Sequence, residues 1–122
     1  MEQQPSGAEI IREAYDLVTG DRQDDYSHPL DDYSRTVEIF YAITGIQLSA
    51  EEAILFMVCV KLSRLANELD EGIDVPDNTR DAIGYLGCLN MARTRRHSTE
   101  QAVEDIFACL GKRYKTGESW GS

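Results

Sequence analysis

The sequence predicts an all-α protein of about five helices, in a bundle of largely antiparallel neighbours. Apolar residues recur with helical spacing in several segments, and helix start and stop signals separate those segments. No stretch combines strict polar–apolar alternation with hairpin turn signals, as a β-sheet would require. Short connections between the predicted helices favour antiparallel packing.

The first predicted helix begins at a capping box, in which the side chains and backbone amides of Ser6 and Glu9 satisfy each other. It ends at Gly20, because glycine readily adopts the left-handed conformation of a helix cap. Pro29 suits the first turn of a second helix, which Gly45 closes.

A second capping box, Ser49 with Glu52, opens the longest and most apolar segment, residues 49–70. This segment is apolar on nearly all sides as far as Lys61, so we expect it to be the central helix of the core. Gly72 then marks its end.

A fourth helix is expected to begin at Asp77 or Asn78, with the basic run at 93–97 near its C-terminus, where cations offset the helix dipole. A third capping box, Ser98 with Gln101, predicts a fifth helix. Residues 1–113 are therefore expected to form a single helical domain. Residues 114–122 are expected to be a flexible tail.

The chain has 122 residues and a formal net charge of −10. This excess of acid argues against general nucleic-acid binding, whose free energy comes largely from Lys and Arg contacts to phosphate. A small phosphorylated ligand held by a few local cations remains compatible with it. No apolar run reaches membrane-spanning length and the N-terminus lacks signal-peptide features, so we expect a cytoplasmic protein with no membrane partner.

The candidate site lies on the hairpin of the central and fourth helices. Charged and phenolic side chains recur there at helical spacing: Lys61, Arg64 and Glu68 on the first helix, and Asp77, Asp81 and Tyr85 on the second. At a rise of about 1.5 Å per residue from the connector, Arg64 falls near the level of Asp81, and Lys61 near that of Tyr85.

Two interpretations of this hairpin stay open. In the first, Arg64 and Asp81 form a partly buried salt bridge that fixes the helix register, and Asp77 is only a helix cap. In the second, Asp77 and Asp81 hold Mg²⁺ together with Glu68, and they are the catalytic residues. Lys61 and Arg64 then contact phosphate, because Mg²⁺ sites commonly combine one or two carboxylates with substrate phosphate.

The link between Gly20 and Pro29 is dense in charged and aromatic residues. A turn requires neither Arg22 nor Tyr26. We therefore expect these two side chains to close over the base or sugar of a ligand, with Tyr85 as a further ligand-binding residue on the hairpin.

The segments TGDRQDDYSHPLDDYSR, KLSRLANE and DNTRDAIGYLG resemble, in this order, a widespread group of small phage-encoded proteins of unassigned function. Ser27 and His28 depart from the glycine and aspartate of that pattern. The helix pair is more distantly similar to nucleotide-modification-associated domains and to MazG-like all-α nucleoside triphosphate pyrophosphohydrolases. That resemblance implies a nucleotide ligand, Mg²⁺, and a homodimer or higher homo-oligomer. The MazG-type metal signature is incomplete, because Glu71 and Asn78 leave too short a gap between its two halves.

The leading hypothesis is a phage-type nucleotide-interacting protein of the host cytoplasm. As an enzyme, it would be a Mg²⁺-dependent hydrolase that releases pyrophosphate from a nucleoside triphosphate, with Asp77 and Asp81 on the metal. The alternative is a non-catalytic phage protein that sequesters a nucleotide or inhibits a host protein. The sequence leaves open whether the protein is an enzyme.

Overall fold

The structure, a computed structural model, describes residues 4–20 and 28–115 and has no strands within them. The all-α class is thereby confirmed. Helix α1 spans Gly7–Thr19, α3 spans Pro29–Thr44, α4 spans Ala50–Glu71 and α5 spans Asp77–Lys115. The described residues thus form four helices, and the predicted number of about five was wrong. Helix α4 is the central helix predicted at residues 49–70.

The predicted fourth and fifth helices are one continuous helix, α5, of 39 residues. Ser98 lies inside this helix, and the next residue, Thr99, donates its hydroxyl to the carbonyl of Arg95 at 3.0 Å. The six residues before Ser98, ARTRRH, contain no glycine or proline. A capping box requires the preceding chain to leave helical geometry, and nothing in this stretch disfavours the helix strongly enough to do so. The helix also continues through Lys115, past the predicted start of the tail, and residues 116–122 lie outside the described ranges.

The first two capping boxes form as predicted. The Ser6 hydroxyl accepts the Glu9 amide at 3.2 Å, and the Ser49 hydroxyl accepts the Glu52 amide at 3.0 Å. Each glutamate accepts the amide of its serine in return. Hydrogen bonds from the Ser49 backbone and from its side chain lower the pKa of Glu52, because they stabilise the charged carboxylate.

Helices α3 and α4 end at the glycines that the sequence indicated. Gly45 has a φ of 75° and Gly72 a φ of 71°, a left-handed conformation that glycine adopts without steric cost. The start of α3 was not predicted in this form: the Nδ1 atom of His28 accepts the Leu30 amide at 3.1 Å and so acts as the N-cap.

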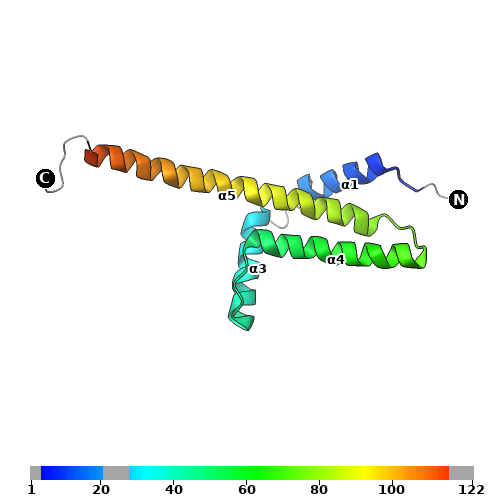
Figure 1. Ribbon diagram of the computed structural model, residues 1–122. Helices are drawn as coiled ribbons and strands as arrows, with labels where there is room; N and C mark the ends of the chain where they lie inside the picture. Colours follow the sequence, from blue (N-terminus) through cyan, green and yellow to red (C-terminus); the bar gives the residue numbers. More distant parts are fainter. Residues whose placement is uncertain (1–3, 21–27, 116–122) are drawn as a thin grey trace.

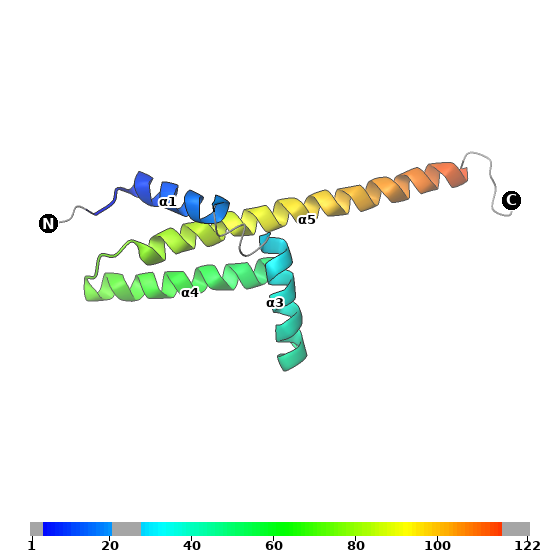
Figure 2. The same cartoon turned by 180° about the vertical axis from the view of Figure 1, so that it is seen from behind.

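Helix α5 is the long axis of the molecule (Figure 1). Helix α4 folds back along its first half as an antiparallel hairpin, whereas α1 lies against that same half and runs in the direction of α5 (Figures 1 and 2). Helix α3 crosses the hairpin steeply near the start of α4. Of the predicted antiparallel neighbours, the α4–α5 pair is therefore the clear case.

The apolar core is small and lies along the first half of α5. The buried apolar residues of the described chain are Ala14, Val37, Ala50, Ile54, Val58, Ala82 and Ala92. Past this core, every residue of α5 from His97 to Leu110 is exposed. None of the described helices is both long enough and apolar enough to span a bilayer.

Candidate functional site

The face that α4 turns toward α5 follows a four–three repeat, which is the spacing of helix-pairing residues. Its members are buried or partly buried: Ile54, Val58, Lys61, Leu65 and Glu68. The first two positions and the fourth carry apolar side chains, as a core face normally does. Two charged residues, Lys61 and Glu68, hold the remaining positions, and the candidate site is built around them.

Lys61 forms an ion pair with Asp81 of α5, with 3.0 Å between the Nζ and Oδ2 atoms. The side chains are 14% and 27% exposed, so the pair is largely shielded from solvent. The predicted Arg64–Asp81 salt bridge was wrong. Arg64 falls outside the four–three repeat of α4, and its side chain is exposed.

Glu68 lies one repeat farther toward the hairpin turn and is 8% exposed. One carboxylate oxygen, Oε1, accepts a hydrogen bond from the side-chain amide of Asn78. The other, Oε2, is buried and has no hydrogen-bond partner. A buried carboxylate oxygen left in this state is unfavourable by about 1–3 kcal/mol or more, so it requires an explanation.

Arg80 joins α1 to the hairpin. Its guanidinium contacts the carboxylate of Glu13 at 2.9 Å and that of Asp77 at 3.0 Å. The hydrogen bond to Glu13 is the main cause of a raised pKa of Arg80. Asp77, expected to be a metal ligand or a cap, is instead a largely exposed partner of Arg80. Sequence analysis missed Glu13 and Arg80, whose pairing depends on how α1 docks.

Tyr85, predicted to bind ligand, interacts with Tyr33 of α3. Burial raises the pKa of Tyr33, and the charge interaction and hydrogen bond with Tyr85 raise it further. Sequence analysis missed Tyr33 as well. Its position one turn before the buried Val37 is the signal that would have indicated it.

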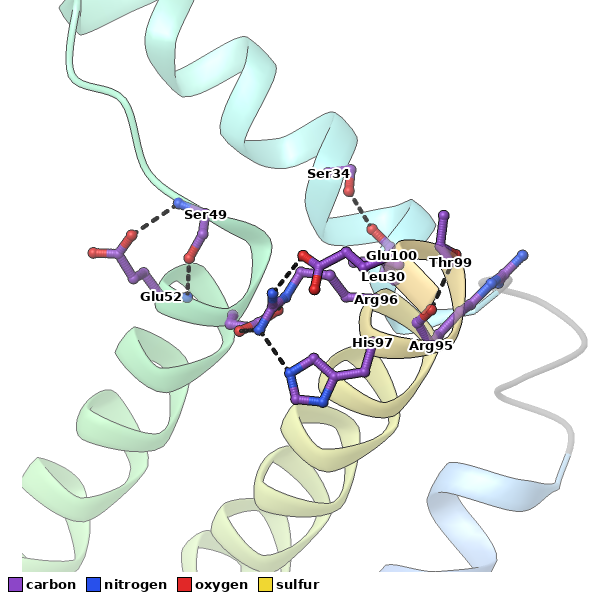
Figure 3. Close-up of polar contacts among 10 residues, drawn as sticks. Leu30, Ser34, Ser49, Glu52, Arg95, Arg96, His97, Thr99 and Glu100 are labelled. Atoms are coloured by element: carbon purple, nitrogen blue, oxygen red, sulfur yellow. Dashed lines mark hydrogen bonds and ion pairs between the residues drawn. The ribbon is translucent and has the colours of Figure 1, made fainter. Parts of the chain in front are cut away.

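A second cluster of charges lies where the start of α4, the start of α3 and the middle of α5 meet (Figure 3). Arg96 contacts the carboxylate of Glu51 and, at 2.8 Å, that of Glu100. Arg95 pairs with Asp31 of α3 at 3.0 Å. The basic run was expected to offset a helix C-terminus. That expectation was wrong because α5 does not end there, and these arginines instead clamp three helices together.

The three carboxylates of the predicted magnesium site are separately engaged: Asp77 with Arg80, Asp81 with Lys61, and Glu68 with Asn78. Within residues 4–20 and 28–115, no group of three or more His, Cys, Asp and Glu side chains is arranged to hold a metal ion. The arrangement shown does not fit a three-carboxylate magnesium centre. Arg22 and Tyr26 lie outside the described residues.

Comparison with known proteins assigns the sequence to a family. Residues 9–93 match the model of a domain of unknown function, DUF6378. The chain is similar to the gene 55 protein of Mycobacterium phage D29, at 25% identity over 113 residues, which cover 93% of this chain and 72% of that protein. No solved structure matches the chain. These findings support a phage protein of unassigned function, as the sequence resemblance predicted.

Proposed function

The chain belongs to the family of domains of unknown function DUF6378, and we propose that it is a phage nucleotide-interacting protein that binds phosphate groups at the α4–α5 hairpin. One observation carries the proposal. Lys61 occupies a core position of α4, only 14% of its side chain is exposed, and its ammonium group is held by Asp81.

A buried ion pair is a weak source of stability, because the cost of desolvating two charges offsets most of their attraction. Apolar residues at positions 61 and 81 would suit the four–three packing face at least as well. Asp81 holds the Lys61 ammonium group in position inside the hairpin. A phosphate group that approaches Lys61 would meet an ammonium group that is already desolvated and held in position.

The local charge is compatible with such a ligand although the whole chain is acidic. The Lys61 ammonium is the cation that the α4 face presents inside the hairpin. A phosphate in direct contact with it would be attracted at short range, and this attraction outweighs a global field that is screened beyond about 8 Å.

The test is a thermal-shift and calorimetric titration of the full chain with a panel of nucleoside triphosphates, diphosphates and monophosphates, with and without Mg²⁺. We expect at least one nucleotide to raise the unfolding temperature, because a ligand at about 100 times its Kd stabilises the folded state by about 2.7 kcal/mol. Lys61→Met should abolish the shift. Arg93→Met, which removes an exposed cation of α5 outside the hairpin cluster, should retain it.

If no nucleotide binds the wild-type chain, or if Lys61→Met binds as well as Arg93→Met, the proposal is wrong. In that case an inhibitor of a host protein becomes the better account. Circular dichroism of both variants ensures that a lost shift reflects lost binding and not lost helix.

A second candidate, Mg²⁺-dependent release of pyrophosphate from a nucleoside triphosphate, is favoured by a different observation. The Oε2 atom of Glu68 is buried without a partner, and a cation beside it would satisfy that oxygen. Because Asp77 and Asp81 are engaged with cations in this structure, the ligand complex would have to rearrange the hairpin before three carboxylates converge.

Pyrophosphate release separates the two candidates. Nucleotide binding without release, in the presence of Mg²⁺, leaves sequestration as the function. Release that disappears in Glu68→Gln and Asp81→Asn, but persists in Glu104→Gln, establishes hydrolysis. Glu104 is an exposed carboxylate on the distal part of α5 and serves as the matched control.

A further inference from the structure

The distal segment of α5, residues 97–115, continues about 28 Å beyond the hairpin and lies alone (Figures 1 and 2). Every residue from His97 to Leu110 is exposed. A helical segment of this length is marginal in water unless an apolar face is packed against something. No other described helix of the same chain covers the segment. A stable helix here therefore requires a partner molecule.

The distal segment carries an apolar stripe at the i, i+3, i+4, i+7 spacing. The members are Val103, Ile106, Phe107 and Leu110, with exposed fractions of 45%, 60%, 67% and 38%. Val103 is eleven residues, close to three helical turns, beyond the fully buried Ala92. The stripe is therefore the continuation of the face that α5 buries against α4 in its first half.

The exposed area of the chain agrees with a missing partner. It amounts to 9181 Å² at a mass of 13.7 kDa, whereas a compact monomer of that mass exposes about 6,600 Å². Part of this exposed surface is the apolar stripe of the distal segment, and part lies on α3, where Ile39, Tyr41 and Ile43 are also exposed.

The order of charges along the segment favours a second copy of the same chain as the partner. Residues 100–105 contain three acidic side chains and no basic one, whereas the last turn, residues 112–115, reads KRYK. Two parallel copies would bring acid beside acid and base beside base. Two antiparallel copies centred between Ile106 and Phe107 instead bring Glu100 of one copy level with Arg113 of the other.

The same antiparallel register also pairs the apolar stripe with itself. Ile106 comes level with Phe107 of the second copy, and Val103 with Leu110. A two-fold symmetric contact requires such self-complementarity, since each residue meets its counterpart twice. We propose that the distal segment of α5 is a homodimerisation surface, on which the same segment of a second copy packs antiparallel.

The experiment uses the full chain and measures mass by sedimentation velocity over a range of concentrations. We expect a dimer that dissociates on dilution. Ile106→Glu and Phe107→Glu should each weaken it by at least about 30-fold, since a charge at the centre of an apolar interface removes a dominant contact. Ala108→Glu places the same charge on the opposite side of the same helix and should leave the dimer intact. Helicity by circular dichroism confirms that each variant still folds.

Charge reversal tests the direction of pairing. Arg113→Glu should weaken the dimer, because it faces Glu100 of an antiparallel copy with a like charge, and adding Glu100→Lys to the same chain should restore it. A chain that is monomeric at all concentrations overturns the proposal. So does a dimer that Ile106→Glu and Ala108→Glu affect equally, or one that the second reversal fails to restore. None of these results depends on nucleotide binding.

Discussion

The two halves of α5 carry the same kind of apolar face and differ in what covers it. In the first half, Ala82 and Ala92 are buried against the rest of the chain. In the distal segment, Ile106 and Phe107 point their larger apolar surface into solvent. The comparison teaches that an amphipathic pattern fixes which face of a helix will be buried, but not which molecule buries it.

The boundary between the halves has a simple geometric cause. Helix α4 has 22 residues and α5 has 39, so α4 spans about 33 Å of a helix about 58 Å long. The Arg96–Glu51 contact marks the level at which α4 begins. Beyond Arg96, α5 extends past the N-terminal end of α4, the helix against which its first half packs.

The largest expected effect contrasts two isoleucines. Ile54→Ala should lower the free energy of unfolding by about 2–5 kcal/mol at any protein concentration, because Ile54 is completely buried within one chain. Ile106→Ala should lower apparent stability only to the extent that it weakens the dimer, so its effect should depend on protein concentration. Urea unfolding at two concentrations a hundredfold apart distinguishes them. A concentration-independent loss in Ile106→Ala would show that the two halves do not differ in this way.

A smaller effect is expected from overpacking. Ala92→Leu should destabilise the chain by about 1–3 kcal/mol, because Ala92 is fully buried and the inserted carbons have no space. Ala108→Leu, at an exposed position of the same helix, should change stability by less than about 0.5 kcal/mol. Thermal unfolding measures both, and equal effects would contradict the packing described for the first half.

The ion pairs of the two clusters provide the next comparison. A double-mutant cycle on Lys61→Met and Asp81→Asn should give a coupling energy of about 1–3 kcal/mol, because that pair is largely shielded. The same cycle on Arg95→Met and Asp31→Asn should give less than about 1 kcal/mol, since both of those side chains are about half exposed. Raising the salt concentration should reduce the second coupling more than the first. A larger coupling energy for the exposed Arg95–Asp31 pair would contradict the view that the Lys61–Asp81 pair is the more shielded one.

The smallest expected effect is a pH dependence at the start of α3. Burial, and secondarily the charge of Arg95, lower the pKa of His28, while Asp31 opposes them. Between the ordinary value near 6.5 and the lowered one, the unfolded chain binds a proton that the folded chain does not. Stability should therefore fall as pH drops below about 6.5, because protonated Nδ1 cannot accept the Leu30 amide.

His28→Asn is the matched variant for this effect, since asparagine is a good N-cap and does not titrate. Wild type should lose up to about 1 kcal/mol more than the variant between pH 7.5 and pH 5.5. Carboxylates titrate equally in both chains and cancel from the difference. Identical pH profiles would mean that His28 does not cap α3 as a neutral group.

The candidate site was predicted in part. The hairpin, and the participation of Lys61, Asp81 and Glu68 in its polar contacts, followed from spacing and a short connector. The partner of Asp81 did not, because counting residues along a helix gives the level of a side chain and not its angle. The four–three repeat of α4 gives the angle, because it includes Lys61 and excludes Arg64. The repeat can be recognised only when the apolar and the charged residues are counted together.

The amino-acid sequence by itself determined the helical class, the two glycine caps and the two capping boxes at Ser6 and Ser49, because each depends on contacts within a few residues. The third box at Ser98 met the same local criteria and was overridden. Only the tertiary structure decided that α1 brings Glu13 to Arg80, and that within the described residues no other helix covers the distal segment. Such outcomes depend on the relative lengths and docking of whole helices, which no local signal contains.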